Sequence, residues 1–313
     1  MKPSLELVFC GTPEFAVPTL EKLVGSGFAV RLVLTQPDRP KGRGLELVAS
    51  PVKRAAERLQ LQIFQPERIK TNEDLRTKLE EITPDAIIVV GYGRIIPNWM
   101  LDLPRFGNIN LHASLLPKYR GAAPIQWAVA NGESVTGVTT MRIDEGLDTG
   151  DTLLQQELAI TDADTAETLS SELAAIGADL MIATLRGLDA GTITSQQQNN
   201  AEASLAPILK KEDGRIDFRR SAQEIYNRFR GFQPWPGAFT TFHGWGLNVT
   251  GMKPSSEKIL QSEVLVRGGQ LFVGCGNGTA MELLEIQPEG KKRMLAKDFV
   301  HGYRPETGNK LGE

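Results

Sequence analysis

A residue able to donate hydrogen bonds and one able to exchange a proton lie two positions apart in the segment NINLH, which spans Asn108–His112. Asn110 carries an amide, and His112 carries an imidazole, a group that changes its charge near neutral pH. Residues two apart in a β-strand point to the same side, so the two groups would converge on one spot. From the residues alone, two interpretations of His112 stay open: a reactive centre, or a structural histidine satisfied by hydrogen bonds.

Further chemistry is available in a glycine-punctuated acidic segment that runs from Asp144 to Asp151. A solvated turn and a metal-binding loop are two interpretations, although the evenly spaced ligands and closing Glu of an EF-hand are missing. A third is that one carboxylate of the segment lies over the histidine, orients the imidazole and stabilises its charge. The third interpretation requires no metal.

An α/β fold must position these residues, because short apolar runs alternate with amphipathic segments through the first half of the chain. This pattern predicts a Rossmann-like parallel sheet flanked by helices. Open sheets of this kind bind ligands at the carboxyl ends of their strands, where Asn110 and His112 would lie. Strands are predicted at 5–10, 29–35, 85–90, 108–112, 135–143 and 152–158, and helices at 14–24, 51–59, 72–81, 125–130 and 165–185.

Two local signals refine this prediction. Thr71 and Asp74 have the spacing of a capping box at the start of the third helix. The first turn, Cys10–Glu14, lacks the G-x-G-x-x-G spacing that a dinucleotide pyrophosphate needs. A hydride-transferring enzyme is therefore disfavoured.

The chain of 313 residues is long enough for two domains. Residues 189–207 have few large apolar side chains and contain a Gln/Asn cluster, which predicts a linker between domains at 1–188 and 208–313. Beyond it, a helix is predicted at 222–230, and short strand-like runs at 263–266, 270–273 and 280–284 predict a smaller β-rich barrel or sandwich.

The net charge of −3 conceals a difference between the two parts of the chain. Residues 209–313 hold 16 Lys and Arg against 12 Asp and Glu, whereas residues 1–208 hold 19 against 26. Aromatic residues lie among the basic ones near 228–235, a pattern that indicates either a nucleic-acid surface or an ordinary charged face. The two cysteines, Cys10 and Cys275, do not have metal or disulfide spacing, and no signal peptide or membrane span is evident, so we expect a cytoplasmic protein.

Four motifs together resemble the methionyl-tRNA formyltransferases, within the wider family of enzymes that use 10-formyltetrahydrofolate. The resemblance runs from end to end and implies an OB-like barrel as the C-terminal domain. It also implies transfer of a formyl group from 10-formyltetrahydrofolate to the α-amine of initiator methionyl-tRNA. The motifs are VFCGTPEFAVPTL (8–20), TQPDRPKGRG (35–44), NLHASLLPKYRGAAPIQWA (110–128) and GLDTGD (146–151).

The same resemblance implies roles for individual residues. Asn110, His112 and Asp148 match the catalytic trio of the family, and the loop after the second strand matches one that enters the acceptor stem of the tRNA. Residues 90–92 and the loop after Asp144 are less specific matches to the pterin pocket. The expected folate contacts are Ser114, Leu115, Leu116 and Pro117, and the expected tRNA contacts are Arg39, Lys41, Arg43, Lys210 and Lys211. Neither a metal, a membrane nor an obligate protein partner is expected.

Two alternatives remain at this point. One is a folate-dependent formyltransferase or hydrolase that acts on a small amine or nucleotide-sugar, and the other is a non-catalytic RNA-binding module. The cationic loop and the basic second domain favour tRNA over a small substrate. Binding alone does not require Asn110, His112 and Asp148 together, which argues against the RNA-binding module.

Overall fold

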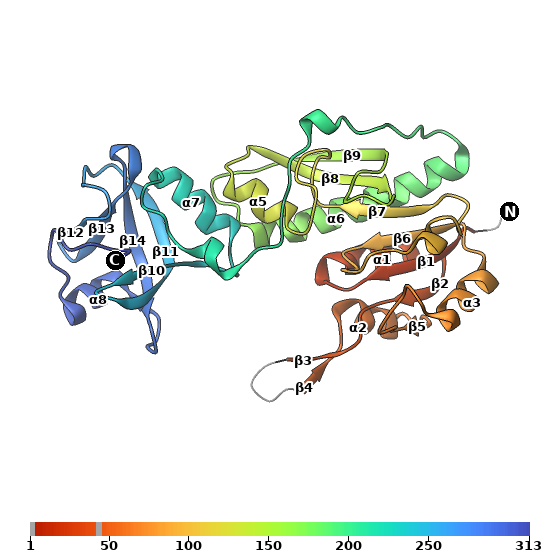
Figure 1. Cartoon of the computed structure of the whole chain (residues 1–313), viewed down its shortest axis with the longest axis horizontal. Helices are drawn as coiled ribbons and strands as arrows, with labels where there is room; N and C mark the ends of the chain where they lie inside the picture. Colours follow the sequence, from red (N-terminus) through yellow and green to blue (C-terminus); the bar gives the residue numbers. More distant parts are fainter. Residues whose placement is uncertain (1–3, 42–45) are drawn as a thin grey trace. The chain divides into compact units, whose positions relative to one another are not determined.

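A computed structural model describes residues 4–41 and 46–313 of the chain (Figure 1). The chain divides into two compact units. The N-terminal unit comprises Met1–Pro124, Val135–Ala159 and Ser170–Ala206, and the C-terminal unit comprises Ile125–Ser134, Ile160–Leu169 and Pro207–Glu313.

A seven-stranded sheet forms the centre of the N-terminal unit, with the strand order β5-β2-β1-β6-β7-β8-β9. The predicted α/β class is confirmed, but the sheet is mixed, because β8 runs antiparallel to β7 and β9 antiparallel to β8. The helix between β7 and β8, α5 (Pro124–Ala130), lies largely in the C-terminal unit. The parallel strands are β1 (Glu6–Gly11), β2 (Ala29–Leu34), β5 (Ile63–Phe64), β6 (Ala86–Val90) and β7 (Asn108–His112), and the antiparallel ones are β8 (Val135–Arg142) and β9 (Thr152–Ala159).

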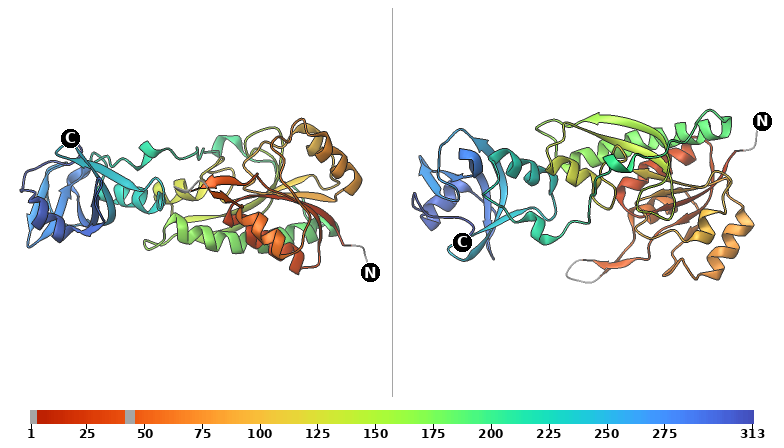
Figure 2. Two further views of the ribbon diagram at one scale, coloured as in Figure 1. Left: turned by 90° about the horizontal axis from the view of Figure 1, so that it is seen from below. Right: turned by 45° about the horizontal axis from the view of Figure 1, so that its top comes forward.

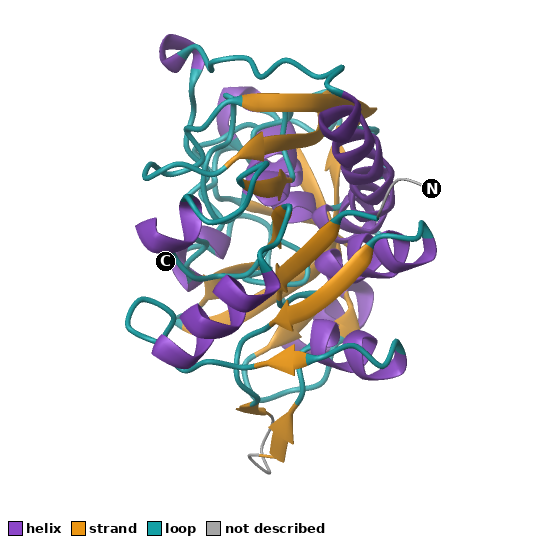
Figure 3. Cartoon of the chain, turned by 90° about the vertical axis from the view of Figure 1, so that its right-hand side faces the viewer, coloured by secondary structure: helices purple, strands orange, loops and turns teal. Residues whose placement is uncertain are grey.

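Helices cover both faces of this sheet (Figures 2 and 3). Every residue of β6 is buried, as expected for a central strand with apolar side chains on both faces. One face carries α1 (Val17–Gly25), after the short helix η1 (Glu14–Ala16), together with α2 (Pro51–Arg58) and α6 (Ala166–Ala190). The other carries α3 (Glu73–Ile82) and α4 (Asn98–Leu101), whose apolar side chains pack on those of β1, β2 and β6.

Two predicted helix boundaries are wrong. The N-cap of α3 is Asn72, whose side chain accepts a hydrogen bond from Leu75 N at 2.8 Å, so Thr71 does not form the predicted capping box. Helix α6 continues to Ala190, five residues beyond the predicted end. Its length and hydropathy would suffice to cross a membrane, but half of the apolar window is buried in the structure, as in the core helix of a folded domain.

The basic segment after β2 was predicted as a loop, and its described parts instead form two short strands. β3 (Arg39–Lys41) pairs antiparallel with β4 (Glu46–Val48). Arg43 lies outside the described residues.

The segment expected to link two domains runs along the N-terminal unit. Thr152 and Gln196 exchange two backbone hydrogen bonds, and Arg120 bridges to Leu205. Ala206 is fully buried. A short helix, η2 (Asn200–Glu202), lies between these two attachments.

The C-terminal unit is built on an antiparallel sheet with the order β10-β11-β14-β13-β12, which confirms the predicted β-rich barrel. Leu311 bridges Phe242 at one edge and Lys310 bridges Glu263 beside the other, so the end of the chain closes the sheet. The strands are β10 (Ala238–Phe242), β11 (Trp245–Ser255), β12 (Val264–Arg267), β13 (Gln270–Gly274), β14 (Ala280–Pro288) and β15 (Met294–Leu295); the helices are η3 (Lys211–Gly214), α7 (Ala222–Gly231), η4 (Gly276–Gly278) and α8 (Ala296–Tyr303).

Strands β10 and β11 were not predicted from the sequence. β11 is irregular, because its register with β14 shifts around Gly251, and an interrupted alternation is hard to recognise from sequence. The barrel interior holds one cluster of buried apolar side chains from the strands, α7 and α8.

Candidate active site

Three parallel strands of the N-terminal unit end beside one another, at the edge where α/β sheets bind ligands. In the register of these strands Cys10 lies beside Val89, and Val89 lies beside Asn110. The carboxyl ends of β1, β6 and β7 therefore meet at this edge. β7 brings Asn110 and His112 to it.

Asn110 and His112 project from the face of β7 that α6 does not cover. Leu111, between them, points to α6, and its side chain approaches Gly177 so closely that a Cβ there would be 2.6 Å from it. The Asn110 amide is half-buried and makes no hydrogen bond to any described residue. Its donor and acceptor groups are thus free for a ligand.

The His112 imidazole is buried, with 5% of the residue exposed, and its two nitrogens have different surroundings. Nε2 lies 2.9 Å from the carbonyl oxygen of Tyr119. A carbonyl can only accept, so Nε2 carries a proton and donates. Nδ1 lies 3.7 Å from Oδ2 of Asp148, too far for a hydrogen bond between them. Nδ1 is therefore the nitrogen available to exchange a proton.

Asp148 reaches His112 from the acidic loop between β8 and β9. Its backbone is in the left-handed region, with φ of 53°, and its Oδ2 accepts a hydrogen bond of 2.8 Å from Gly121 N. The side chain is 19% exposed, so solvent or a ligand can reach it. At the start of the loop, Asp144 accepts hydrogen bonds from Gly146 N and the Thr149 hydroxyl, which holds the loop in shape.

The segment Ser114–Pro117 follows β7 directly and is held by internal hydrogen bonds. The Ser114 hydroxyl donates to the carbonyl of Lys118 at 2.7 Å, and Thr139 Oγ1 both donates to Ser114 O and accepts from Leu116 N. Leu116 is buried, whereas Leu115 and Pro117 are half-buried. Only Leu115 and Pro117 present accessible surface from this segment.

The cations expected to contact tRNA occupy different parts of the chain. Arg39 is exposed on β3, and Lys41 ends the same strand. Lys210 and Lys211 are exposed at the start of η3, and no described carboxylate pairs with their side chains. By contrast, Arg219 is bonded to Asp217 through two of its nitrogens.

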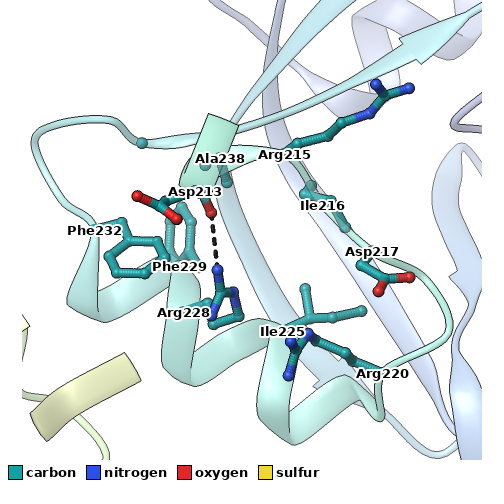
Figure 4. Close-up of a pocket in the computed structure, with 12 residues that line it drawn as sticks. Asp213, Arg215, Ile216, Asp217, Arg220, Ile225, Arg228, Phe229, Phe232 and Ala238 are labelled. Carbon is teal, nitrogen blue, oxygen red and sulfur yellow. Dashed lines mark hydrogen bonds between the residues drawn. The ribbon is translucent and has the colours of Figure 1, made fainter. Parts of the chain in front are cut away.

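Figure 4 shows a small pocket in the C-terminal unit, between α7 and the chain from Asp213 to Arg220. Arg228 donates to the carbonyl of Asp213 and lies 4.8 Å from the centroid of the Phe232 ring. Burial lowers the pKa of Arg228 below its ordinary value. The cavity of about 20 Å³ has room for about one water molecule, so it does not hold a substrate.

Sequence reasoning did not identify four residues that support the site: Tyr119, Arg120, Gly121 and Gln198. Gln198 belongs to the Gln/Asn cluster that was interpreted as part of a linker, and it is 8% exposed. The only signal in the sequence was the polar character of that cluster. Within 4–41 and 46–313, no group of three or more His, Cys, Asp or Glu side chains is arranged to hold a metal ion.

Comparison with known proteins gives the same family for both parts of the chain. Residues 6–185 match a family model described as formyl transferase, and residues 208–304 match a model of the formyl transferase C-terminal domain. The methionyl-tRNA formyltransferase of Koribacter versatilis is 63% identical over 98% of this chain and 98% of its own length. That of Acidobacterium capsulatum is 61% identical over 97% of this chain and 99% of its own.

Solved structures show the same fold at much lower identity. WlaRD, a sugar 3N-formyl transferase, matches with a TM-score of 0.66 and 19% identity, over 93% of this chain and all of its own. An N-formyltransferase from Helicobacter canadensis, solved with folinic acid and dTDP-3-aminofucose, matches with a TM-score of 0.67 and 20% identity, over 91% of this chain and 99% of its own.

Proposed function

The chain belongs to the methionyl-tRNA formyltransferases, and on that basis we propose that Asn110, His112 and Asp148 are its catalytic residues. The enzyme transfers the formyl group of 10-formyltetrahydrofolate to the α-amine of initiator methionyl-tRNA. When bound, the folate supplies the formyl carbon, and the nitrogen that carried this carbon leaves with a proton. The observation that carries the assignment is the 3.7 Å approach of Asp148 Oδ2 to His112 Nδ1 at the carboxyl edge of the sheet.

These side chains suit the reacting end of such a donor. A formyl oxygen accepts hydrogen bonds, and the half-buried amide of Asn110 offers two N–H groups with no described partner. The carboxylate of Asp148 can receive the proton that the amine loses, and an imidazole nitrogen of His112 lies close to it. These side chains therefore suit acyl transfer between two nitrogens, in which an amine attacks the formyl carbon, a proton is transferred and the first nitrogen leaves.

Each residue has one role in this proposal. Attack by the amine places negative charge on the formyl oxygen, and a donor aimed at that oxygen is worth about 3 to 4 kcal/mol. Asn110 Nδ2 is one donor, and His112 is the second when Nδ1 is protonated. Asp148 accepts the proton of the attacking amine and passes it to the departing folate nitrogen, and its carboxylate keeps its place through the hydrogen bond from Gly121 N.

We assign folate contact in the segment Ser114–Pro117 to Leu115 and Pro117. The Ser114 hydroxyl is already bonded to Lys118 O, and the Leu116 carbonyl accepts from the Gln155 amide at 2.8 Å. Leu115 and Pro117 are half-buried and can present apolar surface to a flat ring.

The tRNA is held, in this proposal, by lysine and arginine side chains from both parts of the chain. Residues 208–313 form the domain that meets its backbone through Lys210 and Lys211, and residues 1–188 form the catalytic domain. Arg39, Lys41 and Arg43 meet the acceptor end. We place this activity in the cytoplasm, where charged tRNA is used.

The catalytic assignment is tested by measuring formyl transfer to initiator methionyl-tRNA. Asp148→Asn and His112→Ala each slow the reaction roughly a hundredfold or more, because each removes a proton acceptor or an oxyanion donor. Asp102→Asn is the matched control, since Asp102 is exposed and bonded to no described side chain. Near-wild-type rates for Asp148→Asn and His112→Ala, with unchanged melting curves, would remove these residues from the mechanism.

The tRNA assignment is tested by the dependence of the tRNA Michaelis constant on salt. Replacing Lys210 and Lys211 by Ala reduces the slope of log KM against log salt by about 1 for each lysine that binds a phosphate in the wild type. Arg219→Ala is the control, since its guanidinium is already neutralised by Asp217. An unchanged slope in the double lysine variant contradicts the assignment.

A further inference from the structure

A buried arginine beside the site determines the orientation of Gln198. The side chain of Arg120 donates to Gln198 Oε1 from Nε at 3.1 Å and from an η nitrogen at 2.8 Å. The same η nitrogen donates to Oδ1 of Asn200 at 2.9 Å. A guanidinium has only donors, so the oxygen of the Gln198 amide must face it and the nitrogen must face away.

That nitrogen holds the loop that carries Asp148. Gln198 Nε2 donates to the carbonyl of Asp148 at 2.9 Å and to that of Gly150 at 2.7 Å. Asp148 has a positive φ, a conformation in which a residue other than glycine persists only when its surroundings hold it. The two hydrogen bonds from one amide hold the peptide groups that follow Asp148 and Gly150.

The same segment of chain also supports His112. Ser204 Oγ accepts from Tyr119 N at 2.9 Å, and Ser204 O accepts from Arg120 N at 2.8 Å. The carbonyl of Tyr119 is the acceptor for His112 Nε2. Residues 198–206 thus hold two loops. One supplies the Tyr119 carbonyl that accepts from His112, and the other carries Asp148.

We propose that Gln198 is a positioning residue for formyl transfer, which sets the Asp148 carboxylate against His112 through its two hydrogen bonds to the acidic loop. Arg120 sets the orientation of the Gln198 amide. The proposal rests on the catalytic role assigned to Asp148 above. Gln198 lies between the two segments that match family models, 6–185 and 208–304, and under this proposal it belongs to the active site.

The variant that isolates this role is Gln198→Glu. The carboxylate keeps an oxygen for Arg120 but loses the two N–H donors, and it turns an oxygen toward the carbonyls of Asp148 and Gly150. We expect kcat to fall by about 10- to 100-fold, as for a displaced catalytic group, while KM for tRNA changes much less. Gln197→Glu is the matched control, because Gln197 is exposed, adjacent and bonded to no described side chain, and it keeps the wild-type kcat.

A double-mutant cycle separates positioning from general destabilisation. If Gln198 acts through Asp148, Gln198→Glu lowers kcat much less in the Asp148→Asn background than in the wild type. Gln198→Met, which is neutral and of similar length, is measured in the same way if the glutamate variant does not fold. A full effect of the Gln198 change in both backgrounds overturns the proposal.

Two outcomes distinguish this proposal from the one it rests on. A wild-type kcat for Gln198→Glu beside a slow Asp148→Asn overturns the role of Gln198 alone. A wild-type rate for Asp148→Asn overturns the catalytic role of Asp148, and the role of Gln198 with it.

Discussion

Replacing Gly121 by Ala tests whether the backbone around the site sets the position of Asp148. Gly121 has φ of 120°, a conformation that costs other residues about 1 to 3 kcal/mol. A Cβ at this position would also lie 2.7 Å from Ala206 O, whereas ordinary contacts begin at 3.4 Å. Either the backbone at Gly121 or the one at Ala206 must then move by about 0.7 Å.

That movement is large on the scale of the hydrogen bond to Asp148. Directed away from the carboxylate, it would stretch the 2.8 Å bond from Gly121 N to Asp148 Oδ2 to about 3.5 Å, beyond the normal range. Hydrogen bonds to charged groups contribute about 1.5 to 3 kcal/mol. Since about 1.4 kcal/mol corresponds to tenfold in rate, we expect kcat to fall by about 10- to 100-fold, together with a lower melting temperature.

The assay is formyl transfer to methionyl-tRNA with kcat and KM determined separately, beside thermal unfolding of each variant. Gly25→Ala is the control: Gly25 ends α1, its φ is ordinary, and nothing lies within 4 Å of its added Cβ. This control keeps the wild-type kcat. A Gly121→Ala variant with the kcat and melting temperature of the wild type would show that this backbone does not set the position of Asp148.

Three further predictions concern stability and the thiols. Arg230 is buried and donates three hydrogen bonds. Arg230→Met therefore lowers the free energy of unfolding, measured in urea, by about 3 to 5 kcal/mol, whereas the control Arg58→Met, at an exposed position, lowers it by less than about 1 kcal/mol. Equal losses of stability in the two variants would contradict this prediction. Ser221→Ala removes the N-cap of α7 and costs about 1 kcal/mol by the same measurement, whereas no change would show the cap to be dispensable. Burial raises the pKa of both thiols, that of Cys275 to about 12. Because little thiolate is then present at pH 8, we expect iodoacetamide to alkylate Cys10 and Cys275 only after unfolding. Rapid labelling of the native protein would contradict their burial.

Local patterns were sufficient for the elements that carry the chemistry. The apolar run that forms β6 is buried along its whole length, as predicted from its composition. The period of two in a strand places Asn110 and His112 on one face of β7, because side-chain direction follows from backbone geometry alone. The charge difference between the two parts of the chain also follows from the sequence alone.

Other features depend on pairing partners that are distant in sequence. The antiparallel direction of β8 and β9 follows from how the chain returns to the sheet, and the strand pattern itself is compatible with either direction. The hairpin of β3 and β4 joins segments that are close in sequence, but it and the irregular β11 were also missed, because a short or interrupted strand has a weak pattern of its own and is stabilised by its neighbour.

Residue types and their spacing were enough to establish which groups could react and which side of a strand two of them share. The nitrogen of His112 that is free could be identified only in the folded chain, because it depends on the carbonyl of Tyr119. Folding also brought Asp148 to the imidazole and held it there through Gln198, 50 residues further along the chain. Hydrogen bonds between such distant residues exist only once the chain has folded, and no local pattern records them.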